Sequence, residues 1–297
     1  MNFASPRTRQ LLQAGTWIFA TFLIVVLARS VDVGRVWALA QDVHGSWIAA
    51  AIASNLVILP LWAQQWRSLL PPSSDLSPKR MLSIATQLAF LGNAVPGSGP
   101  VSAVVLLGRE PGVTHTAALS ALALEQTTEG VTKVTVLLIA AQVLPLPDWM
   151  HRALLALAIA VGVLTVVVAI ASRWARDLES LKHPSRLAIA LVCCFGTKAA
   201  EALAIVAVQQ AFAQTLPLST TILVLAAAIL GSIAPLSPAN VGIYEGAVIA
   251  AYRHTGVAPE LALAMAVIQH ACLLLGTAAV GYVVFSVKRF TAARAAG

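Results

Sequence analysis

Three charged residues recur at helical spacing inside one long apolar run of the sequence. Glu125, Glu129 and Lys133 follow one another at intervals of four within residues 115 to 142, so a helix places all three on one face. A charge in the lipid interior costs about 2.5 to 3.5 kcal/mol on the insertion scale, so such side chains normally face a cavity or a partner and mark a functional site. The alternative is a Glu129–Lys133 ion pair that only fixes helix packing.

A second charged pair lies in the apolar run from 187 to 212. Lys198 and Glu201 are three residues apart and therefore share a helix face. They can pair with each other or with the first cluster. In the second case, the two faces would enclose a polar chamber able to hold a zwitterionic or anionic headgroup.

Turn-forming residues interrupt two other apolar stretches, 81 to 108 and 218 to 252. Neither stretch can be one continuous helix, because Pro and Gly break it. The interrupting residues are Gly92, Pro96, Gly97, Gly99 and Pro100 in the first stretch and Gly231, Pro235, Pro238 and Gly242 in the second. Asn93 and Asn240 lie at these breaks, and we include both with Pro96, Gly99, Pro235, Pro238 and Gly242 among the candidate site residues.

The second break offers a place for an anion. Backbone amides freed at the start of a half-helix can bind a phosphate, because that helix end is partly positive. Glu245 stands just inside the returning half-helix and would oppose an anion there, so we expect it to cap the helix or to pair with a Lys. His270, on the last apolar run, is either a hydrogen-bonded packing residue or a proton relay.

The composition is that of an integral membrane protein with one domain. The 297 residues are 59% hydrophobic and 10% charged, whereas soluble domains carry about 25% charged residues. The net charge of +7 comes from Lys and Arg in short loops, which indicates contact with anionic lipid headgroups and not with nucleic acid.

Six apolar runs are long enough to cross a bilayer, which takes about 20 residues. They cover residues 11 to 28, 46 to 66, 115 to 142, 153 to 172, 187 to 212 and 261 to 286. The first resembles a signal peptide but has no small-x-small cleavage site, so we interpret it as a span. Aromatic residues near the loops are expected to anchor the protein at the membrane interfaces: Trp47, Trp66, Trp149, Trp174 and Tyr244.

Charge placement favours re-entrant hairpins at the two broken stretches. With hairpins and a cytoplasmic N-terminus, most loop Lys and Arg fall on the cytoplasmic side, whereas two broken spans would divide them about evenly. Both termini are then cytoplasmic, and the first hairpin enters from the cytoplasm and the second from outside.

Sequence similarity between the two halves supports this inverted arrangement. Gly92, Asn93 and Pro96 match Gly231, Ser232 and Pro235, and GVTHTAAL from Gly112 matches GVAPELAL from Gly256. Broken elements in inverted halves point to a transporter-like site near the middle of the membrane. Chance similarity between two Ala/Leu-rich segments is the alternative.

Motifs of soluble enzymes are missing from the sequence. It has no HExxH, no Walker loop, no GxSxG elbow and no acidic pair at divalent-metal spacing in a loop. Cys193, Cys194 and Cys272 lie inside apolar runs without CxxC spacing and are expected to pack between helices. We therefore predict no metal and no cofactor, and the sequence leaves enzymatic activity open.

Each broken hairpin is followed by a Gly-Val turn and by a long apolar run with a charged centre. In this order of elements, the chain resembles the lysylphosphatidylglycerol synthase transmembrane region, also called the flippase-like domain. The resemblance covers roughly residues 11 to 288. The first hairpin keeps Asn93, Pro96 and Gly99 but has Pro100 and Ala103 at the positions of the family's acid and Arg. The family's E-R-x-x-D is matched by Glu125, Gln126 and Glu129, and its P-x-x-P-G-G-x-G-x-x-E by Pro235, Pro238, Ala239, Asn240, Gly242 and Glu245. His270 replaces a later Arg.

The resemblance implies an all-α polytopic protein of the bacterial inner membrane that moves a phospholipid or another lipid-linked headgroup between leaflets, without the aminoacyl transferase domain of the best-known members. The missing cations imply a less anionic headgroup. Two alternatives are an intramembrane enzyme or accessory subunit of lipid or polyprenyl-linked sugar synthesis, and a scaffold for a partner synthase. Membrane lipids are the expected partners; a lipid-biosynthesis enzyme and a second copy of the chain are further candidates.

Overall fold

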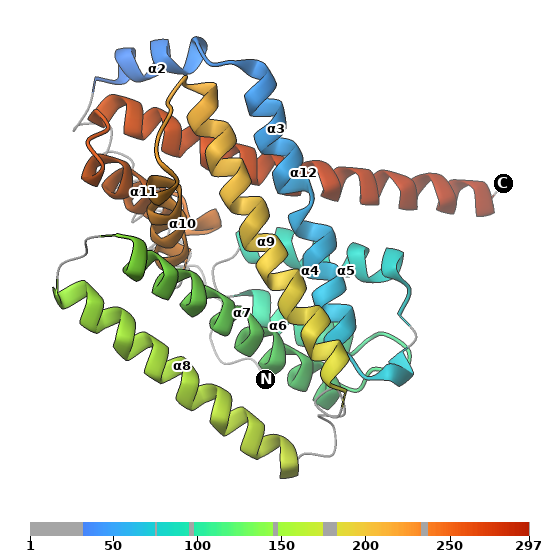
Figure 1. Cartoon of the computed structure of the whole chain (residues 1–297). Helices are drawn as coiled ribbons and strands as arrows, with labels where there is room; N and C mark the ends of the chain where they lie inside the picture. Colours follow the sequence, from blue (N-terminus) through green and yellow to red (C-terminus); the bar gives the residue numbers. More distant parts are fainter. Residues whose placement is uncertain are drawn as a thin grey trace, which may run out of the picture.

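The computed structural model of the chain describes residues 32–74, 76–94, 98–144, 148–174, 183–232 and 237–296. The regular secondary structure of these residues is helical throughout, which confirms the predicted all-α class (Figure 1). The α-helices are α2 (Val33–Gln41), α3 (Gly45–Leu56), α4 (Ile58–Leu69), α5 (Pro78–Ala94), α6 (Ser98–Leu107), α7 (His115–Val143), α8 (Asp148–Trp174), α9 (Pro184–Ala211), α10 (Leu218–Ser232), α11 (Ile243–His254) and α12 (Pro259–Ala296), with short 3₁₀ turns η1 (Pro72–Ser74) and η3 (Pro238–Asn240).

Helices α3 and α4 follow one another with a single break at Val57. Pro60 has no amide proton to donate to the carbonyl of Leu56, so the regular helix is interrupted there and then resumes. Helix α9 lies along both α3 and α4, and α12 crosses α3 (Figure 1). Most of the remaining helices pack against these four.

Three stretches of the described chain are long and apolar enough to cross a membrane: Gly45–Leu69, Pro184–Ala211 and Pro259–Val283. They correspond to the predicted spans 46 to 66, 187 to 212 and 261 to 286. The predicted runs 115 to 142 and 153 to 172 form continuous helices of 29 and 27 residues, and their crossing stays a prediction. The predicted span 11 to 28 lies outside the described residues.

The first broken stretch folds into two helices that lie against each other, α5 and α6. The Ser98 hydroxyl donates a hydrogen bond of 2.8 Å to the Leu91 carbonyl and so ties the start of α6 to the end of α5. At the other end of this hairpin, the Arg80 guanidinium donates to the Glu110 carboxylate over 2.9 Å, which raises the pKa of Arg80. Pro96, between the two helices, lies outside the described residues.

The second broken stretch also folds back on itself, with α10 against α11. The two helices approach closely at their ends, since a Cβ built on Gly231 would lie only 3.1 Å from the Cβ of Ala247. Pro235 lies outside the described residues, and η3 follows it. The turn η3 packs against α5, so the second break lies against the first hairpin.

The chain between η3 and α11 needs backbone conformations that favour glycine. Ala239 and Asn240 have φ values of 50° and 58°, and Gly242, the N-cap of α11, has 88°. Asn tolerates the left-handed region and Gly adopts it freely, but Ala is strained there. This turn directs α11 back along α10.

Each hairpin has its own buried core. One cluster, which includes Trp66, Met81 and Leu107, surrounds α5 and α6, and the other, which includes Val208 and Val248, surrounds α10 and α11. The cysteines Cys193, Cys194 and Cys272 are buried and free, as expected of packing residues. The two cores parallel the repeat that the sequence predicts.

Two of the predicted interface anchors are wrong. Trp66 is only 1% exposed and contacts Trp62 edge to face, and Tyr244 is likewise buried. Position near a loop did not reveal that both side chains point inward. Trp47 is exposed, as an anchor must be.

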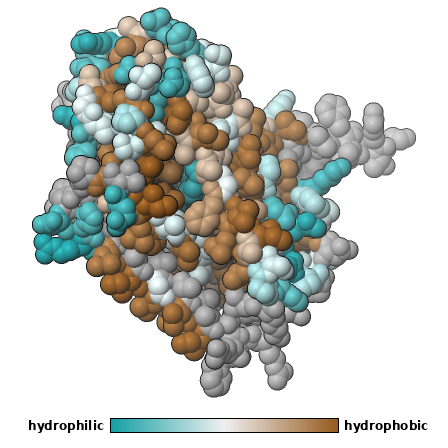
Figure 2. Space-filling view, in the orientation of Figure 1, coloured by the Kyte–Doolittle hydropathy of each residue, from teal (hydrophilic) through white to brown (hydrophobic). Residues whose placement is uncertain are grey.

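Hydrophobic side chains cover the middle of the face shown in Figure 2, and hydrophilic ones gather towards its ends. Helix α8 lies at the outside of the bundle next to α7 and exposes a row of large apolar side chains, including Leu155, Ile159 and Val163 (Figure 1). Such an outer surface suits hydrocarbon and not water.

Close contact between α12 and α3 yields a first test. A Cβ on Gly276 would lie 2.8 Å from the Cβ of Asn55 and 3.3 Å from its backbone carbon, so Gly276→Ala must push the helices apart. We expect a loss of about 1–3 kcal/mol, as for overpacked cores, seen as a lower thermal unfolding midpoint in detergent. Gly162→Ala in α8, with nothing within 4 Å of its Cβ, is the matched control and should be neutral or stabilising. Equal effects of the two variants would contradict the close packing.

The left-handed turn yields a second test. Because Ala239 has a φ of 50°, Ala239→Gly should relieve about 1–2 kcal/mol of backbone strain and raise the unfolding midpoint. Ala251→Gly, within α11, should instead lower it by about 1 kcal/mol. A drop in stability for both variants would show that residue 239 is not in this conformation.

Candidate functional site

A cavity of about 270 Å³ lies where the two hairpin tips meet the long helices. Both hairpins contribute to its wall: Asn93 comes from the end of α5, Ser232 from the end of α10, and Asn240 from η3. Helices α3, α4, α9 and α12 supply the remaining sides. The cavity therefore borders both of the broken stretches that the sequence predicts.

Lys198 and Glu201 form an ion pair in the wall of this cavity. The Lys198 ammonium lies 2.7 Å and 2.9 Å from the two carboxylate oxygens of Glu201. Of the two alternatives for this pair, the structure shows the local one. Lys198 is also within Coulombic range of Glu129 on α7, so the two predicted clusters are electrostatic neighbours.

Glu245 holds the start of α11 and reaches across to α12. One carboxylate oxygen accepts the Gly242 amide over 2.6 Å, and the other lies 2.7 Å from Nδ1 of His270. The predicted capping role of Glu245 is confirmed, but its second partner is a histidine and not a lysine. The capped amide is the one that a phosphate at this break would need.

A second set of hydrogen bonds links α11 to α12 at the cavity wall. The Gln269 amide donates to the Tyr244 hydroxyl over 2.6 Å, and the Tyr252 hydroxyl donates to Gln269 Oε1 over 3.4 Å. The rings of Tyr244 and His270 are in contact, with centroids 4.4 Å apart and planes tilted by 31°. These contacts fix the orientation of His270, which is 4% exposed.

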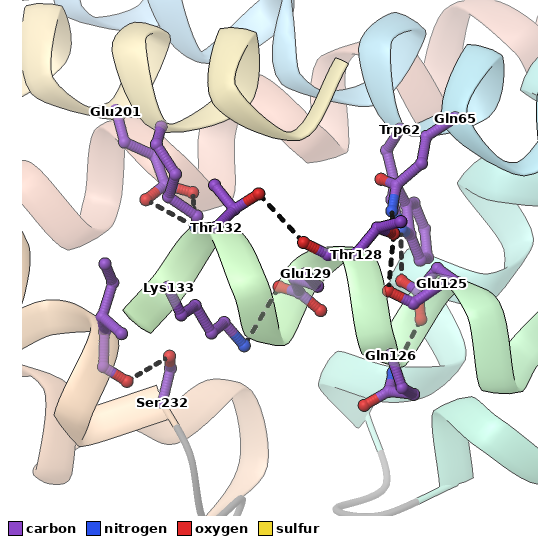
Figure 3. Close-up of polar contacts among 12 residues, drawn as sticks. Trp62, Gln65, Glu125, Gln126, Thr128, Glu129, Thr132, Lys133, Glu201 and Ser232 are labelled. Carbon is purple, nitrogen blue, oxygen red and sulfur yellow. Dashed lines mark hydrogen bonds and ion pairs between the residues drawn. The ribbon is translucent and has the colours of Figure 1, made fainter. Parts of the chain in front are cut away.

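The charged residues of α7 form a separate cluster outside the cavity (Figure 3). Glu125 accepts hydrogen bonds from Trp62 Nε1 over 3.0 Å and from Gln126 over 2.7 Å. Lys133 pairs with Glu129 over 3.0 Å, and in Figure 3 it points towards the end of α10. The predicted internal ion pair is thus present, and both of its side chains remain partly exposed.

Trp62 connects the two polar regions. Its ring lines the cavity while its Nε1 is bonded to Glu125, so it separates the α7 cluster from the cavity and touches both. Gln65, one turn further along α4, donates to Thr128 over 3.2 Å and strengthens the same contact between α4 and α7.

The structure brings Asn93, Lys198, Glu201, Asn240 and His270 together around one cavity, with Glu245 directly behind. Gly99, Pro238 and Gly242 shape the hairpins and are not part of the cavity wall. Among the lining residues that sequence reasoning missed are two buried amides, Asn55 and Gln269. Both interrupt apolar runs, and their polarity is the one signal that could have revealed them.

A lateral groove of about 920 Å³ runs between α5 and α12. It is lined mainly by apolar side chains, with Phe90 and Tyr282 among them. The groove and the cavity share four residues, namely Ala89, Asn93, Leu274 and Thr277. The two spaces are therefore adjacent and separated only by shared side chains.

No group of three or more His, Cys, Asp or Glu side chains within the described ranges is arranged to hold a metal ion. The cavity instead offers hydrogen bonds from amides and hydroxyls, which lie beside paired charges.

The chain was compared with known proteins. No curated protein matches it at a significant level. The model of one family, described as the lysylphosphatidylglycerol synthase TM region, matches residues 13–281 and so covers both hairpins, the cavity and the groove except Tyr282. The chain belongs to the lysylphosphatidylglycerol synthase TM region family.

Proposed function

We propose that this protein moves a lipid between the leaflets of a bacterial inner membrane, with the headgroup in the cavity and the acyl chains in the groove between α5 and α12. Its family makes it a membrane protein linked to lipid metabolism or translocation. The observation that carries the proposal is that a cavity with amides and paired charges in its wall adjoins a more apolar groove, and that the two share Asn93 and Thr277. A lipid has the same two parts, joined in the same way.

The proposal includes a membrane placement for the hairpins. Polar backbone at helix breaks is tolerated at membrane depth only where protein buries it or a cavity borders it. Both tips meet this condition, since η3 packs on α5 beside the cavity. We therefore place the tips near the midplane, with the first hairpin entering from the cytoplasm, the second from outside, and both termini in the cytoplasm.

The cavity would lower the barrier to headgroup passage by replacing lost water contacts. A polar group without a hydrogen-bond partner in hydrocarbon costs several kcal/mol. The amides of Asn93 and Asn240 and the hydroxyls of Ser232 and Tyr244 offer such partners half-way across. Glu129 and Lys133, partly exposed on the α7 face, would line the continuation of this path.

Blocking the groove tests this assignment. Ala278 lines the groove on α12, so Ala278→Trp should obstruct the acyl chains and slow lipid movement by about tenfold or more. The rate is measured in proteoliposomes as the accessibility of a fluorescent lipid to a membrane-impermeant quencher. Val192→Trp, at a position of α9 that is exposed and outside both spaces, is the matched control and should keep the wild-type rate.

Two results would contradict the proposal. An unchanged rate in a folded Ala278→Trp variant would show that lipids do not use the groove. A lipid whose mass changes on incubation with the purified protein would favour the alternative of an intramembrane enzyme.

Joining the two hairpin tips supplies a second test. Asn93 on α5 and Ala239 on η3 line the same cavity, and α5 and η3 are in contact. If the headgroup passes between the tips, a disulfide between Asn93→Cys and Ala239→Cys should abolish lipid movement, and reduction should restore it. Each single cysteine variant controls for the substitution itself. A cross-linked protein that retains its rate would mean that the headgroup takes another route.

A further inference from the structure

We infer that the cavity accepts an uncharged headgroup rich in hydroxyls, that is a glycosyl or polyol group, in preference to a phosphate-bearing or otherwise charged one. This inference rests on the proposed function, because it takes the occupant of the cavity to be a lipid headgroup. It is carried by the amides that line the cavity and by the pairing of the charges around them.

Three asparagines from three elements offer unused hydrogen-bonding capacity. Asn55 on α3 is only 3% exposed and lines the cavity, yet its side chain has no hydrogen-bond partner in the described part of the chain. Asn93 on α5 also lines the cavity, although it is exposed. On η3, Oδ1 of Asn240 is buried and has no partner there either. Buried polar groups are normally satisfied, so the amides of Asn55 and Asn240 point to a ligand, and Asn93 offers a further amide beside them.

The charges at the cavity, in contrast, are already matched. Lys198, the one Lys or Arg among the described lining residues, is bonded to both oxygens of Glu201. His270 is held by Glu245, and the same carboxylate occupies the Gly242 amide at the start of α11. An anion entering this cavity would find the charge of Lys198 already matched and would lie near the carboxylates of Glu201 and Glu245.

Amides and hydroxyls are complementary partners. An amide offers two donors and an acceptor, and a hydroxyl donates and accepts, so one sugar or polyol ring can satisfy several amides at once. A phosphate offers acceptors only and leaves Oδ1 of Asn240 unpaired. A phosphate beside the Lys198–Glu201 pair would also lie close to the partly buried Glu201 carboxylate, and this like-charge contact is unfavourable.

Lipid retention by the purified full chain tests the inference without relying on transport. The protein in mild detergent is offered monoglucosyldiacylglycerol, phosphatidylglycerol and phosphatidylethanolamine with identical acyl chains, and bound lipid is quantified by native mass spectrometry. We expect the glucolipid to be retained about tenfold better than either phospholipid, the gain of one or two well-formed hydrogen bonds.

Variants assign the preference to the cavity. Asn93→Ala and Asn240→Gly should each lower glucolipid retention by about threefold to tenfold and leave phospholipid retention unchanged. Glycine at 240 suits the φ of 58°, so this variant should remain folded. Gln214→Ala removes an amide in the loop after α9, away from the cavity, and should retain the full preference.

Equal or better retention of phosphatidylglycerol, or a glucolipid preference that survives both cavity variants, would overturn the inference. These outcomes are separate from the fate of the proposed function. Selective glucolipid binding without lipid movement in proteoliposomes would refute translocation alone, and movement of phospholipids without glucolipid selectivity would refute the headgroup assignment alone.

Discussion

Two apolar stretches of this protein are broken into paired helices, and the backbone groups freed at each break need hydrogen-bond partners. Hydrocarbon offers no hydrogen bonds, so a broken helix in a membrane needs a partner or a polar cavity beside it. In the described residues, η3 packs against α5 and Glu245 caps the start of α11. The cavity borders both of the broken stretches.

The same constraint explains the treatment of charge. Lys198, Lys133 and His270 each have a carboxylate at 3.0 Å or less, on their own helix for the two lysines and across to α11 for the histidine. Local pairing makes the interior nearly neutral, and neutral amides then dominate what an occupant of the cavity meets. The resemblance to the family led us to expect a less anionic headgroup, and the paired charges give that expectation a physical reason.

Local sequence patterns predicted the helices and their breaks well, but they did not predict which helices pack together. The breaks were visible because Pro and Gly interrupt apolar runs, and Lys198 and Glu201 were grouped because three-residue spacing puts side chains on one helix face. Whether they would bond to each other or to α7 depended on how α9 packs, which spacing does not contain. Asn55 and Gln269 were missed because a single amide in an apolar run gives no periodic signal. Trp66 was placed at the interface by its position in the sequence, whereas its burial depends on the neighbouring helices.

Helix α12 forms part of the wall of both spaces: His270 and Leu273 face the cavity, and Ala278 and Tyr282 face the groove. It is a single uninterrupted helix from Pro259 to Ala296, and its C-terminal part projects beyond the rest of the bundle (Figure 1). Because the same helix borders both spaces, any displacement of α12 would alter the cavity and the groove together.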